Sequence, residues 1–511
     1  MRRVRTRVSA NASAALIVLA SAIFSLGNAA PAEAANPTPL PSSRLEFGLA
    51  NDPTQLSWMT ATGAPWKYRY QYLSAGVNTG HGWETWNSPA GAFAGYYMSA
   101  SGGAGYVPVF SYYEICQSLP ASCTGNQQTD DYNNLNNTST MNAYYANFKL
   151  LMQQAHAYGQ LVVVQVEPDF WGFMEQKAAG GDASTVSASV ASSGFADVAG
   201  IPNTVQGFGE ALLRIRDLYA SNVVLGIHAS MWANGPDVAS STDPTLDVVT
   251  VADGTAAFLG SSGLSSNPYG STWDVVFNDV DDHDAAWWEA QGADNASFTH
   301  WWDPTNTVFP NFARYLSWVT ELHTKTGRQQ VVWQVPEGNQ YFLTENNKCG
   351  HYQDNVADYF INHPQSLVNA GLVAVLFGAG NGCQTNNTDV QGDGVTNNNG
   401  LPTTDLLGGC NACNTHPSVF SDDDGGYLRI FVAQYYAAIS LPARTGVSQS
   451  GANPAGDRTA GQSTSGTAAP RIAHRQAMTE TPRPADLSAA WLQAANALQA
   501  LVDWLLHNAL V

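Results

Sequence analysis

The sequence predicts a closed (β/α)8 TIM-type barrel over residues 44–444. Eight short β-rich runs alternate with longer helical or loop segments, a pattern typical of a parallel sheet covered by helices. No glycine-rich phosphate-binding loop follows the first run, so the barrel is favoured over an open doubly wound sheet. Acids, amides and tryptophans recur directly after the runs, where such barrels carry their chemistry.

Each run has the length and composition of a strand. The run Leu161–Val166 is β-branched and is followed by Glu167 and Pro168, which indicates a strand buried on both faces. The strands are expected at 45–49, 68–73, 106–112, 161–166, 223–228, 273–277, 330–335 and 372–377. Apolar spacing predicts helices at 141–158, 205–219, 312–326 and 355–369.

Composition narrows the class of partner. The chain has 511 residues, 44% of them hydrophobic, and 21 Lys and Arg against 41 Asp and Glu give a net charge of −20. Such an acidic chain repels nucleic acid and anionic membranes. Only 12% of residues are charged, which suits an exported protein that handles a neutral polar ligand. A polysaccharide or oligosaccharide is the expected partner, and a monomer is expected.

The two ends of the chain differ from the predicted barrel. Residues 1–34 combine a basic start, an apolar stretch and Ala32-Glu33-Ala34, which predicts a secretory signal peptide and a secreted, extracellular protein. A Pro/Ser-rich lead follows at 35–43. Residues 445–486 are rich in Gly, Ser, Thr, Ala and Pro and predict a flexible linker. Apolar spacing in 487–511 predicts one amphipathic C-terminal helix.

Six cysteines in an exported chain favour disulfides over metal binding. Cys116 and Cys123 are close in sequence, as are Cys410 and Cys413, and a Cys349–Cys383 bond would join two loops. The pairing stays open on sequence grounds. The Cys410/Cys413 pair offers only half a zinc site, and no metal ligand is expected.

Two glutamates follow expected strands and form a candidate catalytic pair. Glu167 follows the fourth strand and Glu337 the seventh, and a closed barrel places all its strand ends around one mouth. Cleavage of a glycosidic bond needs one carboxylic acid to protonate the leaving oxygen and one carboxylate to attack or to activate water. The alternatives are two unrelated rim carboxylates, or a helix-capping role for Glu167 or Asp169.

This arrangement resembles the clan A retaining glycoside hydrolases, which carry an acid/base Glu after strand four and a nucleophile Glu after strand seven. The resemblance implies that Glu167 is the acid/base, that Glu337 is the nucleophile, and that Arg69 steadies the nucleophile. The sequence departs from that pattern at Val166, where the clan usually has Asn, and at Phe377, where it has Trp.

A second stretch, Val166-Glu167-Pro168-Asp169, resembles the Glu-Pro-Asp strand of family 6 glycoside hydrolases, which are inverting cellulases. Residues 223–228 stand where that family has its next strand. Its catalytic-acid motif has only Glu114-Ile115-Cys116 as a counterpart. The clan A assignment is therefore placed first.

Further residues near strand ends are expected to bind substrate, because aromatic faces stack on sugar rings and polar groups bind hydroxyls. They are Trp83, Trp86, Asp169, Trp171, His228, Trp232, Asp279 and Asn339. The acidic run 279–284 is interpreted as a solvated sugar-binding loop, with a divalent metal site as the alternative. No cofactor is expected to be required. The stretch 389–394 is compatible with a structural calcium ion, although Gly400 stands where a calcium loop has its bidentate Glu.

The sequence thus predicts a secreted glycoside hydrolase that cleaves a polysaccharide, a β-glucan, by a two-carboxylate retaining mechanism. The alternatives are an inverting cellulase-like hydrolase and a non-catalytic glycan-binding barrel.

Overall fold

The computed structural model describes residues 39–41, 43–378, 380, 382–383, 385–388, 413–418, 420 and 426–439. The signal peptide at 1–34, the linker at 445–486 and the helix at 487–511 lie outside the described residues, and so does the stretch 389–394 that suggested calcium.

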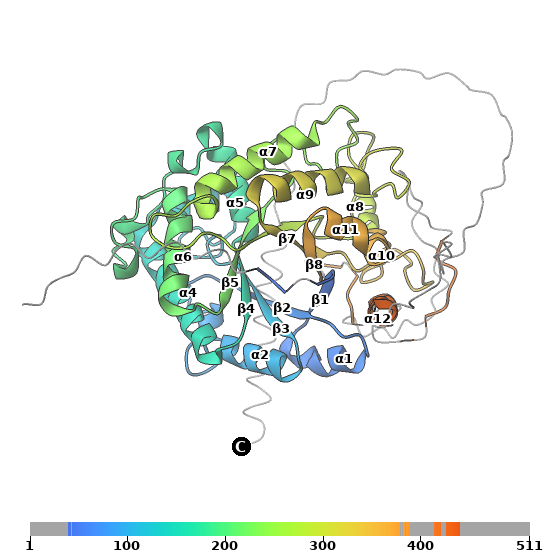
Figure 1. Ribbon diagram of the computed structural model, residues 1–511, viewed down its shortest axis with the longest axis horizontal. Helices are drawn as coiled ribbons and strands as arrows, with labels where there is room; N and C mark the ends of the chain where they lie inside the picture. Colours follow the sequence, from blue (N-terminus) through green and yellow to red (C-terminus); the bar gives the residue numbers. More distant parts are fainter. Residues whose placement is uncertain are drawn as a thin grey trace, which may run out of the picture. The chain divides into compact units, whose positions relative to one another are not determined.

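Eight parallel strands close into a barrel in the order β1-β2-β3-β4-β5-β6-β7-β8, which confirms the predicted (β/α)8 fold (Figure 1). Their bounds lie within two residues of those predicted: β1 Glu46–Ala50, β2 Tyr68–Leu73, β3 Val107–Tyr112, β4 Val162–Val166, β5 Val223–Ala229, β6 Val275–Asp279, β7 Gln329–Val335 and β8 Leu372–Phe377. Each strand pairs with its neighbours in sequence, and β1 pairs with β8 to complete the circle.

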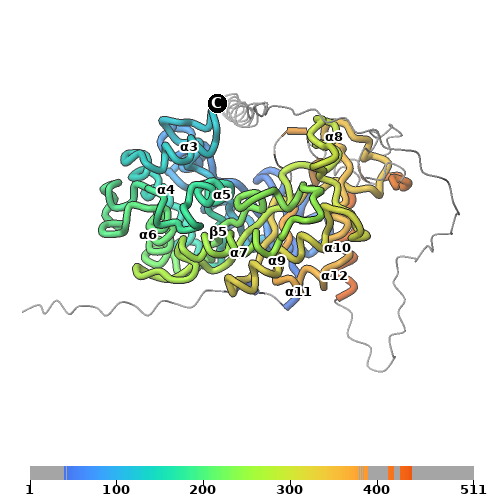
Figure 2. The backbone as a smooth tube through the Cα atoms, turned by 90° about the horizontal axis from the view of Figure 1, so that it is seen from above, coloured from blue at the N-terminus to red at the C-terminus, as the bar shows by residue number. Residues whose placement is uncertain are grey.

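Helices surround the strands, as Figures 1 and 2 show. They are α1 Leu56–Ala61, α2 Ala92–Gly103, α3 Gln127–Leu135, α4 Thr138–Tyr158, α5 Pro168–Lys177, α6 Val205–Tyr219, α7 Val248–Leu259, α8 Ala285–Ala290, α9 Phe312–Thr326, α10 Val356–Asn362, α11 Pro364–Asn369 and α12 Tyr427–Ile439. The single helix predicted at 355–369 is divided into α10 and α11, because Pro364 lacks an N–H and restricts the residue before it.

The barrel interior is a packed core. Alternate strand residues point inward, and they include Tyr68, Tyr70, Val163, Phe277 and Trp333. Gly226 leaves room for the Phe277 ring, because a Cβ atom there would lie 2.3 Å from it. Leu40 of the N-terminal lead joins the same core, and its N–H donates to Gln329 Oε1 at 2.7 Å.

Disulfides join segments beyond the strand ends. Cys116 bonds to Cys123 and Cys349 bonds to Cys383; these are two of the candidate pairs that the sequence left open. Cys413 is also disulfide-bonded, while Cys410 lies outside the described residues. Among the described helices, none is long and apolar enough to cross a bilayer.

Candidate active site

Glu167 ends β4 in a buried and strained position. Its φ angle is +48°, a left-handed conformation that costs a non-glycine residue about 1–3 kcal/mol. Its carboxylate accepts hydrogen bonds from the backbone N–H groups of Glu114 (3.0 Å) and Ile115 (3.2 Å) in the loop after β3. Burial raises the pKa of Glu167 to about 8, although these two hydrogen bonds act to lower it. Glu167 therefore keeps its proton to a higher pH than an ordinary glutamate, and its oxygens hold the loop after β3.

Two other buried acids lie near Glu167. Glu114 and Asp131, which is on α3, are 0% and 1% exposed, and burial followed by the charge of Glu167 raises the pKa of both well above the usual range. The group lies beneath the loop after β3 and is closed to solvent. In this conformation a polysaccharide cannot reach the carboxyl groups of Glu114, Asp131 and Glu167.

Glu337, after β7, has different surroundings. Its Oε1 atom accepts a hydrogen bond from Asn387 Nδ2 at 3.3 Å. It also lines a small cavity of about 10 Å3 together with Trp58, Asn387 and Arg429. The two predicted catalytic glutamates thus follow strands of one barrel, as expected, but they face different parts of it.

Arg69 faces the outside of the barrel. Its neighbours Tyr68 and Tyr70 point inward, so strand alternation turns Arg69 toward the helices. Its guanidinium donates to Asn51 Oδ1 (2.7 Å), Ser101 Oγ (3.2 Å) and the Asp52 carbonyl (3.0 Å). Arg69 therefore ties the loop after β1 to α2, away from the barrel interior where the resemblance had placed it.

Three aspartates near the C-terminal ends of the strands interact electrostatically with Tyr72. Asp169 follows β4, Asp279 ends β6 and Asp282 lies in the next loop. Burial raises the pKa of Tyr72 well above its usual range, and the charges of all three aspartates raise it further. All three carboxylates are at least partly exposed, in contrast to Glu167. We call this group the barrel mouth; it includes Asp169 and Asp279, which the sequence analysis named as substrate-binding rather than catalytic residues.

The environments of these aspartates push their pKa values apart. Burial and the charges of Asp279 and Asp282 raise the pKa of Asp169 to about 6. For Asp282, burial acts upward, but the hydrogen bond and charge of His283 outweigh it and hold the pKa below its usual value. The His283 Nδ1 atom lies 2.8 Å from Asp282 Oδ1. One mouth carboxyl group therefore keeps its proton more readily while the other stays ionised.

Polar side chains hold this mouth in place. Gln334 on β7 has a φ angle of +54°, and the pairing of β7 with β8 shifts register around it. This local distortion changes the direction of a strand side chain, and Gln334 hydrogen-bonds Tyr72. On the other side, Gln127 of α3 hydrogen-bonds Asp169 and donates to Tyr113 Oη at 2.8 Å.

The predicted tryptophans divide into two groups. Trp83 and Trp171 are 0% exposed, and their indole N–H groups donate to Asn147 Oδ1 (2.7 Å) and the Val166 carbonyl (2.9 Å). These two are core residues and cannot stack on a sugar, which corrects the prediction. Trp86 and Trp232 are partly exposed, and Trp232 leans on Phe173 at 4.7 Å between ring centroids.

Asn339 organises its own loop. It is 0% exposed, its Oδ1 accepts from the N–H groups of Tyr341 (2.9 Å) and Phe342 (3.0 Å), and its Nδ2 donates to Glu345 at 3.0 Å. A substrate-binding role, which the sequence suggested, would require these bonds to break.

The mouth includes residues that the sequence analysis did not single out. Tyr72 could have been found, because it continues the inward alternation of Tyr68 and Tyr70. Gln127 and Gln334 carry no such signal, since one lies on a helix after a long loop and the other depends on an irregular strand. Within the described part of the chain, no group of three or more His, Cys, Asp or Glu side chains is arranged to hold a metal ion.

Comparisons with known proteins find only remote resemblances. No protein-family model matches the sequence, and no curated protein matches it. Solved structures that resemble it include an endo-β-1,4-mannanase from Cellulomonas fimi (11% identity, TM-score 0.39, covering 69% of this chain and 68% of that one). A family 1 β-glucosidase from Thermotoga maritima is 10% identical (TM-score 0.35, 64% and 76%).

The endoglucanase Cel6 from Mycobacterium tuberculosis, in complex with a thio-linked cellobioside, is 13% identical with a TM-score of 0.25. This match covers 54% of the present chain and 64% of the endoglucanase. The resemblance to barrel-fold glycoside hydrolases is thus remote, and it carries no argument about the reaction.

Proposed function

We propose that the protein is a glycoside hydrolase that cleaves a polysaccharide at the barrel mouth formed by Asp169, Asp279 and Asp282. The observation that supports the proposal is the group of three carboxylates at this end of the barrel that interact electrostatically with Tyr72, with the pKa of Asp169 raised and that of Asp282 lowered. Hydrolysis of a glycosidic bond needs a protonated and an ionised carboxyl group together.

Each aspartate has a role in this proposal. Asp169, with a pKa of about 6, donates its proton to the leaving oxygen. Asp282 is ionised and its side chain is 50% exposed, so it can meet a water molecule and accept a proton from it. Asp279, held by His228 at 3.2 Å, binds a sugar hydroxyl. A base that activates water gives inversion at the anomeric carbon.

The proposal assigns the role of general acid to Asp169 instead of Glu167, which lies two residues earlier in the chain. Glu167 is 0% exposed and its oxygens accept backbone N–H groups, whereas Asp169 is partly exposed and faces the other mouth carboxylates. Retention through Glu167 and Glu337, the mechanism expected from the sequence, remains the rival assignment. A β-glucan remains the proposed substrate, and the partly exposed Trp232 is the proposed stacking platform.

The test is reducing-sugar release from soluble β-glucan, mannan and xylan. We expect D169N and D282N to lose at least about 100-fold in kcat, the usual contribution of general acid–base catalysis. E337Q is expected to keep most of its activity. The matched control is D253N, because Asp253 lies on α7 in a surface ion pair with Lys325 and such pairs contribute little.

The outcomes are distinct. An α-anomer released first from a β-glucan indicates inversion, whereas a β-anomer together with inactive E167Q and E337Q would return the reaction to the glutamates. Wild-type activity in D169N would overturn the proposed site. A wild type that binds glycans and cleaves none would make the barrel a binding protein and overturn the proposed reaction.

A further inference from the structure

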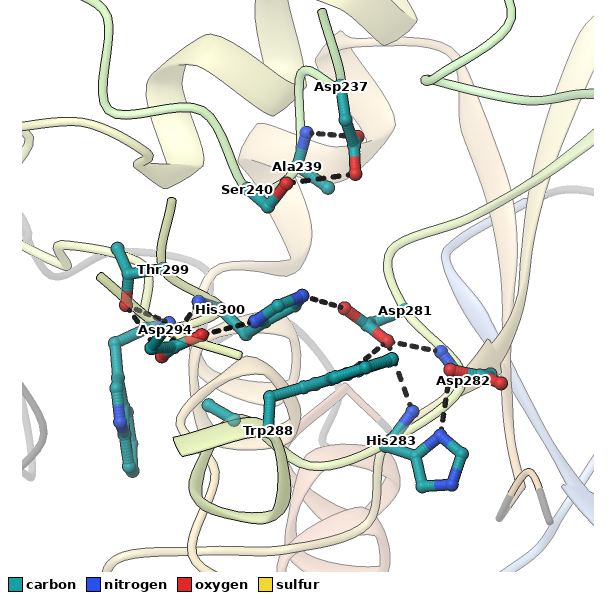
Figure 3. A network of polar contacts seen from close by, with 12 residues as sticks. Asp237, Ala239, Ser240, Asp281, Asp282, His283, Trp288, Asp294, Thr299 and His300 are labelled. Carbon is teal, nitrogen blue, oxygen red and sulfur yellow. Dashed lines mark hydrogen bonds and ion pairs between the residues drawn. The ribbon is translucent and has the colours of Figure 1, made fainter. Parts of the chain in front are cut away.

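A chain of polar groups leads away from Asp282 into the protein (Figure 3). His300 lies between two aspartates: its Nδ1 atom is 2.6 Å from Asp294 Oδ1, and its Nε2 atom is 3.4 Å from Asp281 Oδ2. Asp281 is the sequence neighbour of Asp282. The side chain of Asp294 is 0% exposed, while those of His300 and Asp281 are 14% and 19% exposed. The chain therefore runs from a buried carboxylate to the mouth.

The hydrogen-bond donors assign the proton positions. Asp294 Oδ2 accepts from Thr299 Oγ1 (3.0 Å) and the His300 N–H (3.3 Å), so Asp294 acts as an acceptor and His300 Nδ1 carries a hydrogen. The Nε2 atom then faces Asp281 Oδ2 at 3.4 Å, a longer contact than the one to Asp294. Trp288 keeps the imidazole in place, because its ring stacks on His300 at 4.6 Å with an interplanar angle of 13°.

The side chains of Asp281 and Asp282 hydrogen-bond each other, and Asp281 also holds the backbone of the loop. Asp281 Oδ1 accepts from the Asp282 N–H (2.7 Å), the His283 N–H (3.2 Å) and Trp288 Nε1 (2.7 Å). Burial and then the charge of Asp282 raise the pKa of Asp281 well above its usual range, while Asp282 shifts in the opposite direction. The proton of the pair is therefore kept on Asp281, the member that faces His300.

We propose that Asp281, His300 and Asp294 form a proton relay that serves Asp282 during hydrolysis. The inference rests on the proposed function of the mouth. It gives a role to His300, Asp294 and Trp288, which do not belong to the group of aspartates at the mouth. His300 and Asp294 act through other residues and are positioning residues.

The step conserves every proton. An O–H bond of water breaks as its oxygen bonds to the anomeric carbon, and the proton passes to Asp282. The glycosidic C–O bond breaks, and its oxygen takes the proton of Asp169. Asp282 passes its proton to Asp281 as Asp281 releases its own to His300 Nε2, so an imidazolium faces Asp294. The proton later returns along the same path to solvent, and Asp169 takes one up.

Two further acidic side chains lie near His300. Besides Asp281 and Asp294, the carboxylates of Asp237 and Asp354 interact electrostatically with it. Asp237 comes from the loop after β5, and Asp354 from the segment before α10. Asp237 is itself held by the Ala239 N–H (2.9 Å) and Ser240 Oγ (3.0 Å), as Figure 3 shows. Acidic side chains from four segments thus surround one imidazole.

H300Q in the full-length protein tests the relay, because a Gln amide still donates a hydrogen bond toward Asp281 but cannot accept and return a proton. We expect kcat on a soluble glycan to fall about tenfold or more, with KM and the thermal midpoint unchanged. Imidazole added to H300A should restore part of the lost kcat. The matched control is H156Q, since His156 is exposed on α4. A kcat of H300Q equal to that of the wild type at every pH from 5 to 8 would overturn the relay.

A second measurement separates this inference from the proposed function. In 15N-histidine-labelled protein, the imidazole signals of His300 are identified by their absence in H300Q. The Nδ1–H signal should lie far downfield and move in D294N, and the Nε2 signal should move in D281N. These shifts are read without any glycan. If the wild-type protein shows these shifts but cleaves no glycan, the proposed hydrolase function is overturned. If the Nε2 signal is unchanged in D281N, the relay is overturned even when the enzyme is active.

Discussion

The Nε2 atom of His228 lies 3.2 Å from Asp279 Oδ1, at the top of a polar chain inside the barrel. Ser111 Oγ donates to Gln165 Oε1 at 3.2 Å, and Gln165 Nε2 lies 2.9 Å from His228 Nδ1. Because an amide nitrogen only donates, His228 Nδ1 is the acceptor and its Nε2–H points at Asp279. The chain thus fixes both the tautomer of His228 and the direction of Asp279.

H228A should therefore weaken both folding and substrate binding. It leaves the Gln165 amide unpaired inside the barrel, a loss of about 1–3 kcal/mol in unfolding free energy, and it frees Asp279, so KM should rise. S111A breaks the other end of the chain and should leave KM unchanged. Urea unfolding and steady-state kinetics on both variants check this, and equal KM values for H228A and wild type would contradict it.

The activity should fall as pH rises through about 6. The pKa of Asp169 is raised to about 6, and a general acid must be protonated to act, so kcat/KM should decline above that pH. The opposite limb should lie below the usual range of an aspartate, because the pKa of Asp282 is lowered. A pH profile of kcat/KM tests both limbs. The residual activity of D169N should lack the limb near 6, and persistence of that limb would assign it to another group.

Glu167 should make stability depend on pH. Its pKa is raised from 4.5 to about 8 by burial, so between these values the folded protein binds more protons than the unfolded chain, and stability falls as pH rises. E167Q removes this titration but keeps an oxygen for the two backbone N–H groups. Its unfolding free energy relative to wild type should therefore rise from pH 4.5 to pH 8 in urea titrations. A constant difference over that range would show that Glu167 is ionised in the folded state.

Trp171 and Trp232 should respond oppositely to truncation. Trp171 is fully buried, so W171A should lose about 3–5 kcal/mol of stability. Trp232 is partly exposed, so W232A should fold normally and raise KM roughly two- to tenfold, as expected for one aromatic contact of 0.5–1.5 kcal/mol. Thermal melts and KM for a long glycan distinguish the two. A destabilised W232A with unchanged KM would remove Trp232 from the substrate path.

Much of the fold was determined by the sequence itself. Apolar runs such as Leu161–Val166 can be buried only as central strands, and their alternation with helices leads to one closed barrel. The sequence also predicted a site at the C-terminal ends of the strands, because parallel strands bring these ends together, and the proposed site lies there. Asp169, His228 and Asp279 were identified for that reason, and the structure places all three at the mouth or directly beneath it.

Only the tertiary structure decided which of the neighbouring side chains face the mouth. Strand alternation suggests an inward Glu167, but its left-handed backbone turns the carboxylate to the N–H groups of Glu114 and Ile115 and leaves Asp169 at the opening. Arg69 lies on the strand where the resemblance implies an arginine beside the nucleophile, yet its side chain faces the helices. His300 meets Asp281 only because the segment after α8 folds back. Such directions depend on backbone irregularities and long-range contacts, which no local pattern of residues encodes.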